Sequence, residues 1–228
     1  RLTGSLPLKN EVRAVLDKVN IHWQSTHPTH GDHFWNRAVY HIGNMEAYAA
    51  TGMQQYRDFS TAWATKNNWC GATGTDKSKW KYANYGEGAD YVLFGDHQVC
   101  FQTYIDLYNL DEVKDETKIA RALEVMDYEI STSNVDYLWW VDGLFMVMPI
   151  MTKLYHITGN QTYLDKMYLY WQYANSTMYD NETGLYFRDA KYVYPAHTTN
   201  AGKKDFWARG DGWIFACFAK VLADLPAT

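Results

Sequence analysis

Residues 139–161 read WWVDGLFMVMPIMTKLYHITGNQ, and this stretch decides the fold. Apolar and aromatic side chains run from Trp140 to Ile157 and predict a buried helix. Gly159 follows, and glycine suits the left-handed conformation that ends many helices. The more polar stretch from Gln161 to Tyr179 predicts a second helix directly after this tight turn. The segment is therefore expected to form a helical hairpin.

The same unit recurs along the chain. Asp96 and Asp142 are spaced by about one helical-hairpin period, and Thr51-Gly52 repeats the turn at Thr158-Gly159. Repetition gathers the starts of the inner helices at one rim of a ring, so Asp96, Asp142 and Asp211 are expected at one funnel mouth. The other helices are predicted over residues 8–23, 34–51, 54–67, 97–108, 115–129 and 212–223, with a short strand within 184–189.

Helical periodicity and the low count of 5 Pro favour an all-α fold over an all-β one. The hairpins predict a toroid forming a single catalytic domain over residues 1–228. Four inner helices are visible and the last lacks a partner helix. The ring is therefore expected to be incomplete in this chain. Either the ring is open or, as we favour, the chain lacks the C-terminal hairpins of a longer protein.

Composition narrows the function classes. The 228 residues are 47% hydrophobic and 21% charged, with a net charge of −5 and no basic stripe, which argues against a nucleic-acid or anionic-membrane partner. No apolar run approaches the ~20 residues of a membrane span. The three cysteines lack the spacing of a zinc site, and no metal or cofactor is expected. The sequence does not fix the compartment, although a periplasmic or secreted location is slightly favoured.

The high aromatic content, with 10 Trp and 19 Tyr, suits either a core or a surface that faces sugar rings. Asp142 follows Trp139-Trp140, and an apolar wall of this kind would raise the pKa of a carboxyl group and let it deliver a proton. Asp96, in Gly95-Asp96-His97-Gln98, offers a second carboxylate. The competing interpretation is that both residues only cap helices.

A cationic motif follows in Trp207-Ala208-Arg209. A guanidinium group binds a carboxylate through two points, although a structural arginine stacked on tryptophan fits the pattern equally well. His197 lies in the preceding loop, and the residues alone do not select it. The residues thus predict an acidic, aromatic, arginine-bearing pocket for an anionic sugar.

The order of these motifs resembles that of the unsaturated rhamnogalacturonyl hydrolases of glycoside hydrolase family 105, relatives of the unsaturated glucuronyl hydrolases of family 88. The resemblance implies an (α/α)6 barrel. It also implies release of a 4,5-unsaturated uronic acid from the non-reducing end of lyase-generated acidic oligosaccharides, by hydration of the C4–C5 double bond. The matching segments are residues 35–52, 96–98, 102–108, 140–146, 184–186 and 207–213.

The resemblance also implies roles for single residues. Asp142 matches the general acid/base and Asp96 the second pocket aspartate. The implied substrate-binding residues are Tyr40, Trp140, His197, Trp207 and Arg209. In one departure, the segment matched to Arg-Gly-Asn-Gly-Trp has Asp211 at the Asn position, which adds negative charge near an anionic substrate.

Three alternatives remain at this point. An inverting glycosidase would use Asp142 and Asp96 on a saturated sugar. A polysaccharide lyase could occupy the same fold. A non-catalytic helical-repeat scaffold would bind a protein or sugar without chemistry. The sequence leaves open which unsaturated acidic oligosaccharide is the substrate, with fragments of rhamnogalacturonan, ulvan, arabinogalactan and glycosaminoglycan all possible, and it leaves the oligomeric state open.

Overall fold

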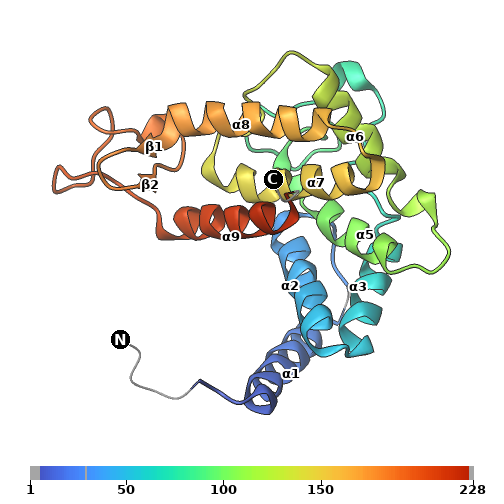
Figure 1. Ribbon diagram of the computed structural model, residues 1–228. Coiled ribbons are helices and arrows are strands. Elements are labelled where there is room, and N and C mark those ends of the chain that lie inside the picture. Colours follow the sequence, from blue (N-terminus) through green and yellow to red (C-terminus); the bar gives the residue numbers. More distant parts are fainter. Residues whose placement is uncertain (1–5, 29, 226–228) are drawn as a thin grey trace.

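The computed structural model describes residues 6–28 and 30–225, and helices dominate them (Figure 1). The helices are α1 (Lys9–Thr26), α2 (Trp35–Thr51), α3 (Gln54–Lys66), α4 (Gly95–Gln98), α5 (Cys100–Asn109), α6 (Ala120–Ser131), α7 (Val141–Thr158), α8 (Thr162–Met178) and α9 (Ala208–Asp224). Strands β1 (Tyr179–Asp180) and β2 (Leu185–Tyr186) form a small antiparallel hairpin. None of the described helices is both long and apolar enough to cross a membrane.

The predicted hairpins are present. Helices α2 and α3 are joined at Gly52, and α7 and α8 at Gly159, with φ angles of 71° and 68°. Each glycine N–H donates to the carbonyl four residues back, Tyr48 in one turn and Tyr155 in the other. Two turns of the same geometry therefore separate the inner helices α2 and α7 from their outer partners. The all-α class predicted from the sequence is confirmed.

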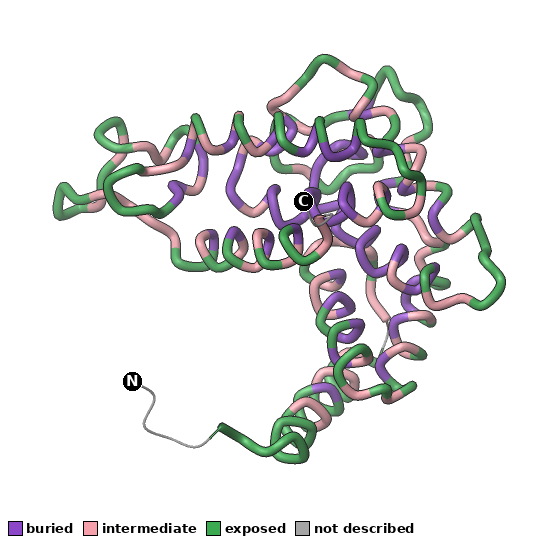
Figure 2. The backbone as a smooth tube through the Cα atoms, in the orientation of Figure 1, coloured by how far each residue is buried: buried purple, intermediate pink, exposed green. Residues whose placement is uncertain are grey.

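Helix α7 forms the centre of the core (Figure 2). Leu144, Val147, Ile150, Met151 and Leu154 are fully buried along it. It packs against α5, α8 and α9. Burying each side chain of this size contributes ~1.5–3 kcal/mol, so the apolar run that predicted the helix also supplies much of the driving force for folding.

A proline interrupts the hydrogen bonding of α7. Pro149 has no N–H to donate to the carbonyl of Phe145, four residues earlier. The side chain of Gln102, from α5, supplies the missing donor, with its Nε2 2.8 Å from the Phe145 oxygen. The buried side chain of Gln102 thus satisfies a backbone carbonyl of the neighbouring inner helix that the proline leaves without its usual donor.

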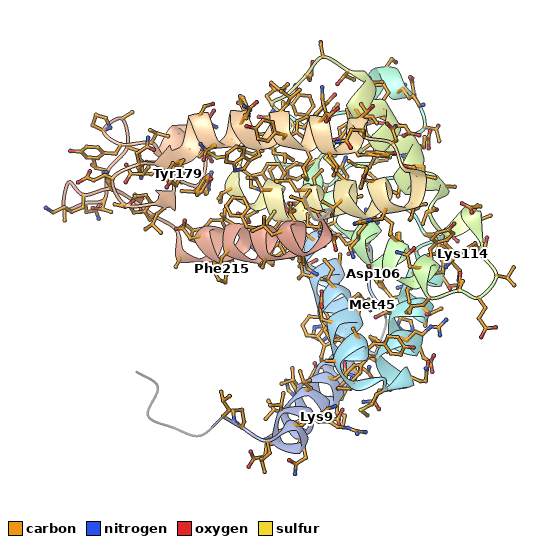
Figure 3. All side chains as sticks on the ribbon, in the orientation of Figure 1. Lys9, Met45, Asp106, Lys114, Tyr179 and Phe215 are labelled. Carbon is orange, nitrogen blue, oxygen red and sulfur yellow. The ribbon has the colours of Figure 1, made fainter. Side chains whose placement is uncertain are left out.

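Ion pairs link the C-terminal halves of the inner helices. Lys153 of α7 contacts Asp106 of α5 at 2.5 Å, and Lys220 of α9 pairs with Glu46 of α2. Asp106 and Met45 line one depression where α5 and α2 meet (Figure 3). The pairs connect segments far apart in the sequence, because Glu46 and Lys220 belong to the first and last of these helices.

A buried carboxyl group contacts the last residue of α4, Gln98. Glu129 of α6 is fully buried, and its Oε1 accepts a hydrogen bond from Nε2 of Gln98. Its Oε2 and the Oε1 of Gln98 are buried without a partner among the described atoms. Burial raises the pKa of Glu129 to about 8, although the Gln98 hydrogen bond and the charge of Lys166 oppose the shift. The folded protein therefore holds Glu129 in its neutral form up to mildly alkaline pH.

This group predicts a pH-dependent stability. The unfolded chain releases the proton near pH 4.5 and the folded protein near pH 8, so Glu129 lowers the free energy of unfolding as pH rises between these values. A Glu129→Gln variant mimics the neutral acid and should lose this dependence. Urea unfolding at pH 5.5 and pH 8 would measure it, with the exposed Glu112→Gln as control. Parallel pH trends for wild type and Glu129→Gln would contradict the assignment.

Candidate active site

A pocket of about 300 Å³ lies where the N-terminal turns of the inner helices converge. Trp35 is the first residue of α2, and Asp96, Asp142 and Arg209 are each the second residue of α4, α7 and α9. The pocket is also lined by Tyr85, Phe94, Trp139, Trp140, Arg188, Asp189 and Trp207. Since helix N-termini carry partial positive charge, their convergence favours a negatively charged ligand.

Trp140 fixes the relative positions of the first turns of α4 and α7. Its indole contacts Phe94, with ring centroids 4.8 Å apart. A Cβ placed on Gly95 or on Gly143 would lie about 3 Å from this indole. The glycines beside Asp96 and Asp142 therefore allow both carboxyl-bearing turns to approach the same aromatic ring, which brings the two acids into one pocket.

Asp142 is a carboxyl group withdrawn from water. Its Oδ1 is buried and has no hydrogen-bond partner among the described residues. Burial raises the pKa of Asp142 to about 6, against opposing effects from Arg209, from a backbone N–H and from Arg188. The group can therefore carry a proton in mildly acidic solution and release it near neutrality, as a general acid/base must.

Asp96 has a second raised pKa in the same pocket. Burial raises it to about 7, and the charges of Asp142 and Glu87 add to the shift. The two carboxyl groups thus titrate as a pair, in which ionisation of Asp142 holds the last proton on Asp96. Between about pH 6 and pH 7 the pocket therefore holds a carboxyl group that is mostly protonated, Asp96, and one that is mostly ionised, Asp142.

The positive charge of the pocket comes from two arginines. The guanidinium of Arg209 lies 4.3 Å from the ring centre of Trp207 and 6.0 Å from that of Trp35. The second one, Arg188, was not predicted, because it lies in a stretch expected only to form a short strand. An isolated β-bridge between Trp140 and Asp189 brings Arg188 to the pocket, and no local sequence pattern indicates this bridge.

Two residues implied by the resemblance lie elsewhere. Tyr40 hydrogen-bonds Asn20 and stacks on Trp23 at 4.7 Å, both on α1. It lies five residues beyond Trp35 on α2, so it points about 140° away around the helix and about 7.5 Å further along. His197 pairs with Asp205 at 2.7 Å. Neither lines the pocket, and their roles in substrate binding stay predictions.

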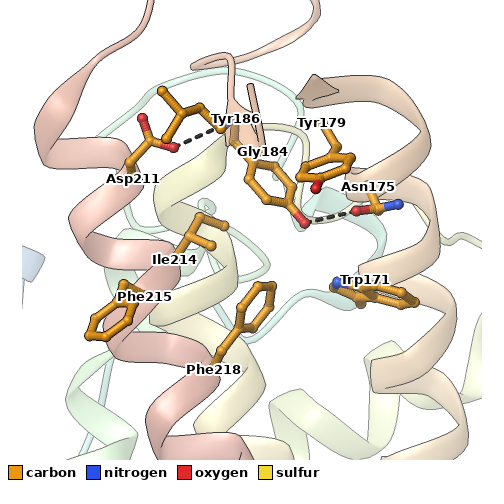
Figure 4. A pocket seen from close by; sticks show the side chains of 10 residues that line it. Trp171, Asn175, Tyr179, Gly184, Tyr186, Asp211, Ile214, Phe215 and Phe218 are labelled. Atoms are coloured by element: carbon orange, nitrogen blue, oxygen red, sulfur yellow. Dashed lines mark hydrogen bonds between the residues drawn. The ribbon is translucent and has the colours of Figure 1, made fainter. Parts of the chain in front are cut away.

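The expectation that Asp211 shares the funnel mouth with Asp96 and Asp142 is wrong. Helix α9 begins at Ala208, four residues earlier than predicted, so Asp211 lies inside its first turns. Two residues after Arg209 it points about 200° around the helix, to the opposite face. It lines a separate groove between α8, β2 and α9, where its Oδ1 accepts the Tyr186 N–H at 2.9 Å (Figure 4).

The chain is similar to known carbohydrate-active proteins. Residues 8–228 match the model for Glycosyl Hydrolase Family 88. The chain is 26% identical to an unsaturated 3S-rhamnoglycuronyl hydrolase of Formosa agariphila, over 95% of this chain and 58% of that protein. It is 60% identical to a solved structure named as a polysaccharide lyase, with a TM-score of 0.93, over 96% of this chain and 61% of the other.

A second solved structure, a glycosyl hydrolase family 88 protein from Bacteroides vulgatus, is 55% identical with a TM-score of 0.93, over 97% of this chain and 63% of that one. The chain therefore spans less than two thirds of the length of each of these proteins. Its helices belong to an (α/α)6 toroid and form part of the ring, which confirms the predicted fold class.

The approach of α9 to α7 predicts opposite effects for two neighbouring glycines. A Cβ on Gly210 would lie 2.6 Å from Cγ1 of Val141, a buried and stiff side chain, whereas a Cβ on Gly212 meets nothing within 4 Å. Gly210→Ala should destabilise by ~1–3 kcal/mol and displace Arg209. Gly212→Ala should be neutral or stabilise by up to ~1 kcal/mol. Equal urea midpoints for the two variants would contradict this packing.

Proposed function

Because this chain belongs to Glycosyl Hydrolase Family 88, we propose that it releases a 4,5-unsaturated uronic acid from the non-reducing end of lyase-generated acidic oligosaccharides. The observation that carries the proposal is the buried, unpaired Oδ1 of Asp142 in a pocket that also holds Asp96 and Arg209. In this proposal, the chain forms a single catalytic domain.

Asp142 performs both proton transfers of the reaction. Its protonated carboxyl group delivers a proton to C4 of the double bond, and positive charge develops at C5 and on the ring oxygen. Water then adds to C5 while the Asp142 carboxylate takes a proton from it, which restores the acid. The resulting hemiketal rearranges, the ring opens and the remaining sugar leaves. One carboxyl group suffices, unlike the two of ordinary glycosidases.

The other pocket residues bind and orient the unsaturated ring. Arg209 takes the substrate carboxylate, because a guanidinium group offers a two-point fork and the nearby helix N-termini favour negative charge. Asp96 retains a proton near neutrality and donates a hydrogen bond to a sugar hydroxyl. The indoles of Trp140 and Trp207 form apolar walls for the ring and exclude water from Asp142.

Within this reaction class, we favour a uronide linked to rhamnose, as in the unsaturated rhamnogalacturonyl hydrolases of family 105. The support is the name of the relative from Formosa agariphila, an unsaturated 3S-rhamnoglycuronyl hydrolase. Fragments of pectin, ulvan and arabinogalactan made by lyases all present an unsaturated uronide at the end that this pocket would accept.

A lyase is the second candidate, because one similar solved structure is named as a polysaccharide lyase. The sign of an absorbance change separates the two activities. The hydrolase removes the conjugated double bond and lowers the ultraviolet absorbance of an unsaturated oligosaccharide. A lyase acting on the intact polysaccharide creates that bond and raises the absorbance. An inverting glycosidase acting on a saturated sugar leaves the ultraviolet absorbance unchanged.

Replacing the acid should separate activity from folding. Asp142→Asn cannot deliver a proton, and we expect turnover of an unsaturated uronide to fall ~10²–10⁴-fold. Because Asp142 is a buried acid with a raised pKa, the neutral amide should leave the melting temperature unchanged or higher. Asp211→Asn, in the separate groove, serves as the matched control and should keep its activity. Near-parental turnover by Asp142→Asn would refute the role of Asp142.

The pH profile should follow the same group. In the free enzyme, kcat/KM should fall above about pH 6, where Asp142 loses its proton. The positive charge of Arg209 lowers the pKa of Asp142, so Arg209→Gln should move this falling limb to higher pH even though binding is weaker. A limb that stays in place or moves to lower pH would show that a different group titrates.

A further inference from the structure

The backbone holds Arg188 beside the proposed acid. Its carbonyl accepts the N–H of Val141, the first residue of α7, at 2.8 Å. The next residue, Asp189, forms a β-bridge with Trp140. Arg188 is therefore tied to the turn that carries Asp142. It is one of the residues that line the same pocket, and its charge lowers the pKa of Asp142.

The guanidinium of Arg188 is held in one orientation. Its Nε and Nη2 both donate to Oδ2 of Asp189, at 2.9 and 2.8 Å, and Oδ1 of Asp189 accepts the Lys191 N–H at 2.8 Å. The group lies 4.4 Å from the ring centre of Tyr192. In the part of the chain that the structure describes, Nη1 makes no hydrogen bond, so one end of a fixed fork remains available.

The charges of the two arginines are balanced differently. Asp189 is buried, with 4% of its side chain exposed, and its carboxylate offsets the charge of Arg188. Arg209 forms no ion pair with any residue between positions 6 and 225 that the structure describes, and it rests on the indole of Trp207. Arg209 therefore presents a positive charge that has no ion-pair partner among these residues, whereas the charge of Arg188 is offset by the carboxylate of Asp189 and its Nη1 remains as an oriented donor.

We propose that Arg188 is a specificity-determining residue whose Nη1 donates a hydrogen bond to an uncharged substrate oxygen, a hydroxyl or the glycosidic oxygen, while Arg209 binds the carboxylate. This division of labour rests on the proposed function. A lysine cannot replace Arg188, because an ammonium group paired with Asp189 has no rigid second arm that reaches the substrate.

Two substrates and three variants test the proposal. The substrates are an unsaturated uronyl disaccharide and its methyl ester, which lacks the negative charge. Arg188→Gln/Asp189→Asn removes the guanidinium and leaves the pair neutral. Since a lost hydrogen bond from a charged donor weakens binding about tenfold or more, KM should rise about tenfold on both substrates, with kcat within about threefold. Arg209→Gln should raise KM on the acid and have little effect on the ester.

Arg188→Lys provides the check on folding, because it keeps a cation beside Asp189. It should raise KM on both substrates while the melting temperature stays near that of the wild type. A KM increase that appears on the acid and disappears on the ester would place the carboxylate on Arg188 and overturn the proposal. If the wild type is active and both Arg188 variants keep its KM, the role of Arg188 is overturned while the proposed function stands. A wild type that consumes neither substrate would overturn the proposed function, and this inference with it.

Discussion

The close contact of helix starts around Trp140 and Val141 is the constraint on which the site depends. Gly95 approaches the Trp140 indole, Gly210 approaches the Val141 side chain, and the Val141 N–H binds the carbonyl of Arg188. These contacts place the beginnings of α4, α7 and α9 and the segment after β2 within one small volume. Each of these four segments then needs to supply only one polar side chain to build a complete pocket.

The same close packing sets the electrostatics. Withdrawing Asp142 from water raises its pKa, and the charge of Asp142 contributes to the raised pKa of Asp96. Burial alone would push the pKa of Asp142 further, but Arg209 and Arg188 lower it. The result is an acid that exchanges its proton near neutrality. A carboxyl group in water would already be ionised, and one buried without cations would keep its proton.

The hairpins were predictable because short, local sequence patterns encode them. An apolar run followed by Gly52 or Gly159 identifies an inner helix and its end, and topology then gathers the residues that begin such helices, including Asp96 and Asp142. Side-chain direction was less accessible. Asp211 was misplaced because α9 starts at Ala208, and a shift of the start by a few residues changes which face a residue occupies. Arg188 was missed because a long-range β-bridge, with no local signal, brings its segment to the pocket.

The pocket walls carry an additional consequence. Four of the ten tryptophans, Trp35, Trp139, Trp140 and Trp207, surround the two carboxyl groups and the two guanidinium groups. Indole emission responds to nearby charge and to the exclusion of water. An anionic sugar that enters this space changes both, so the protein carries its own optical reporter, and ligand occupancy can be followed by intrinsic fluorescence without a label or turnover.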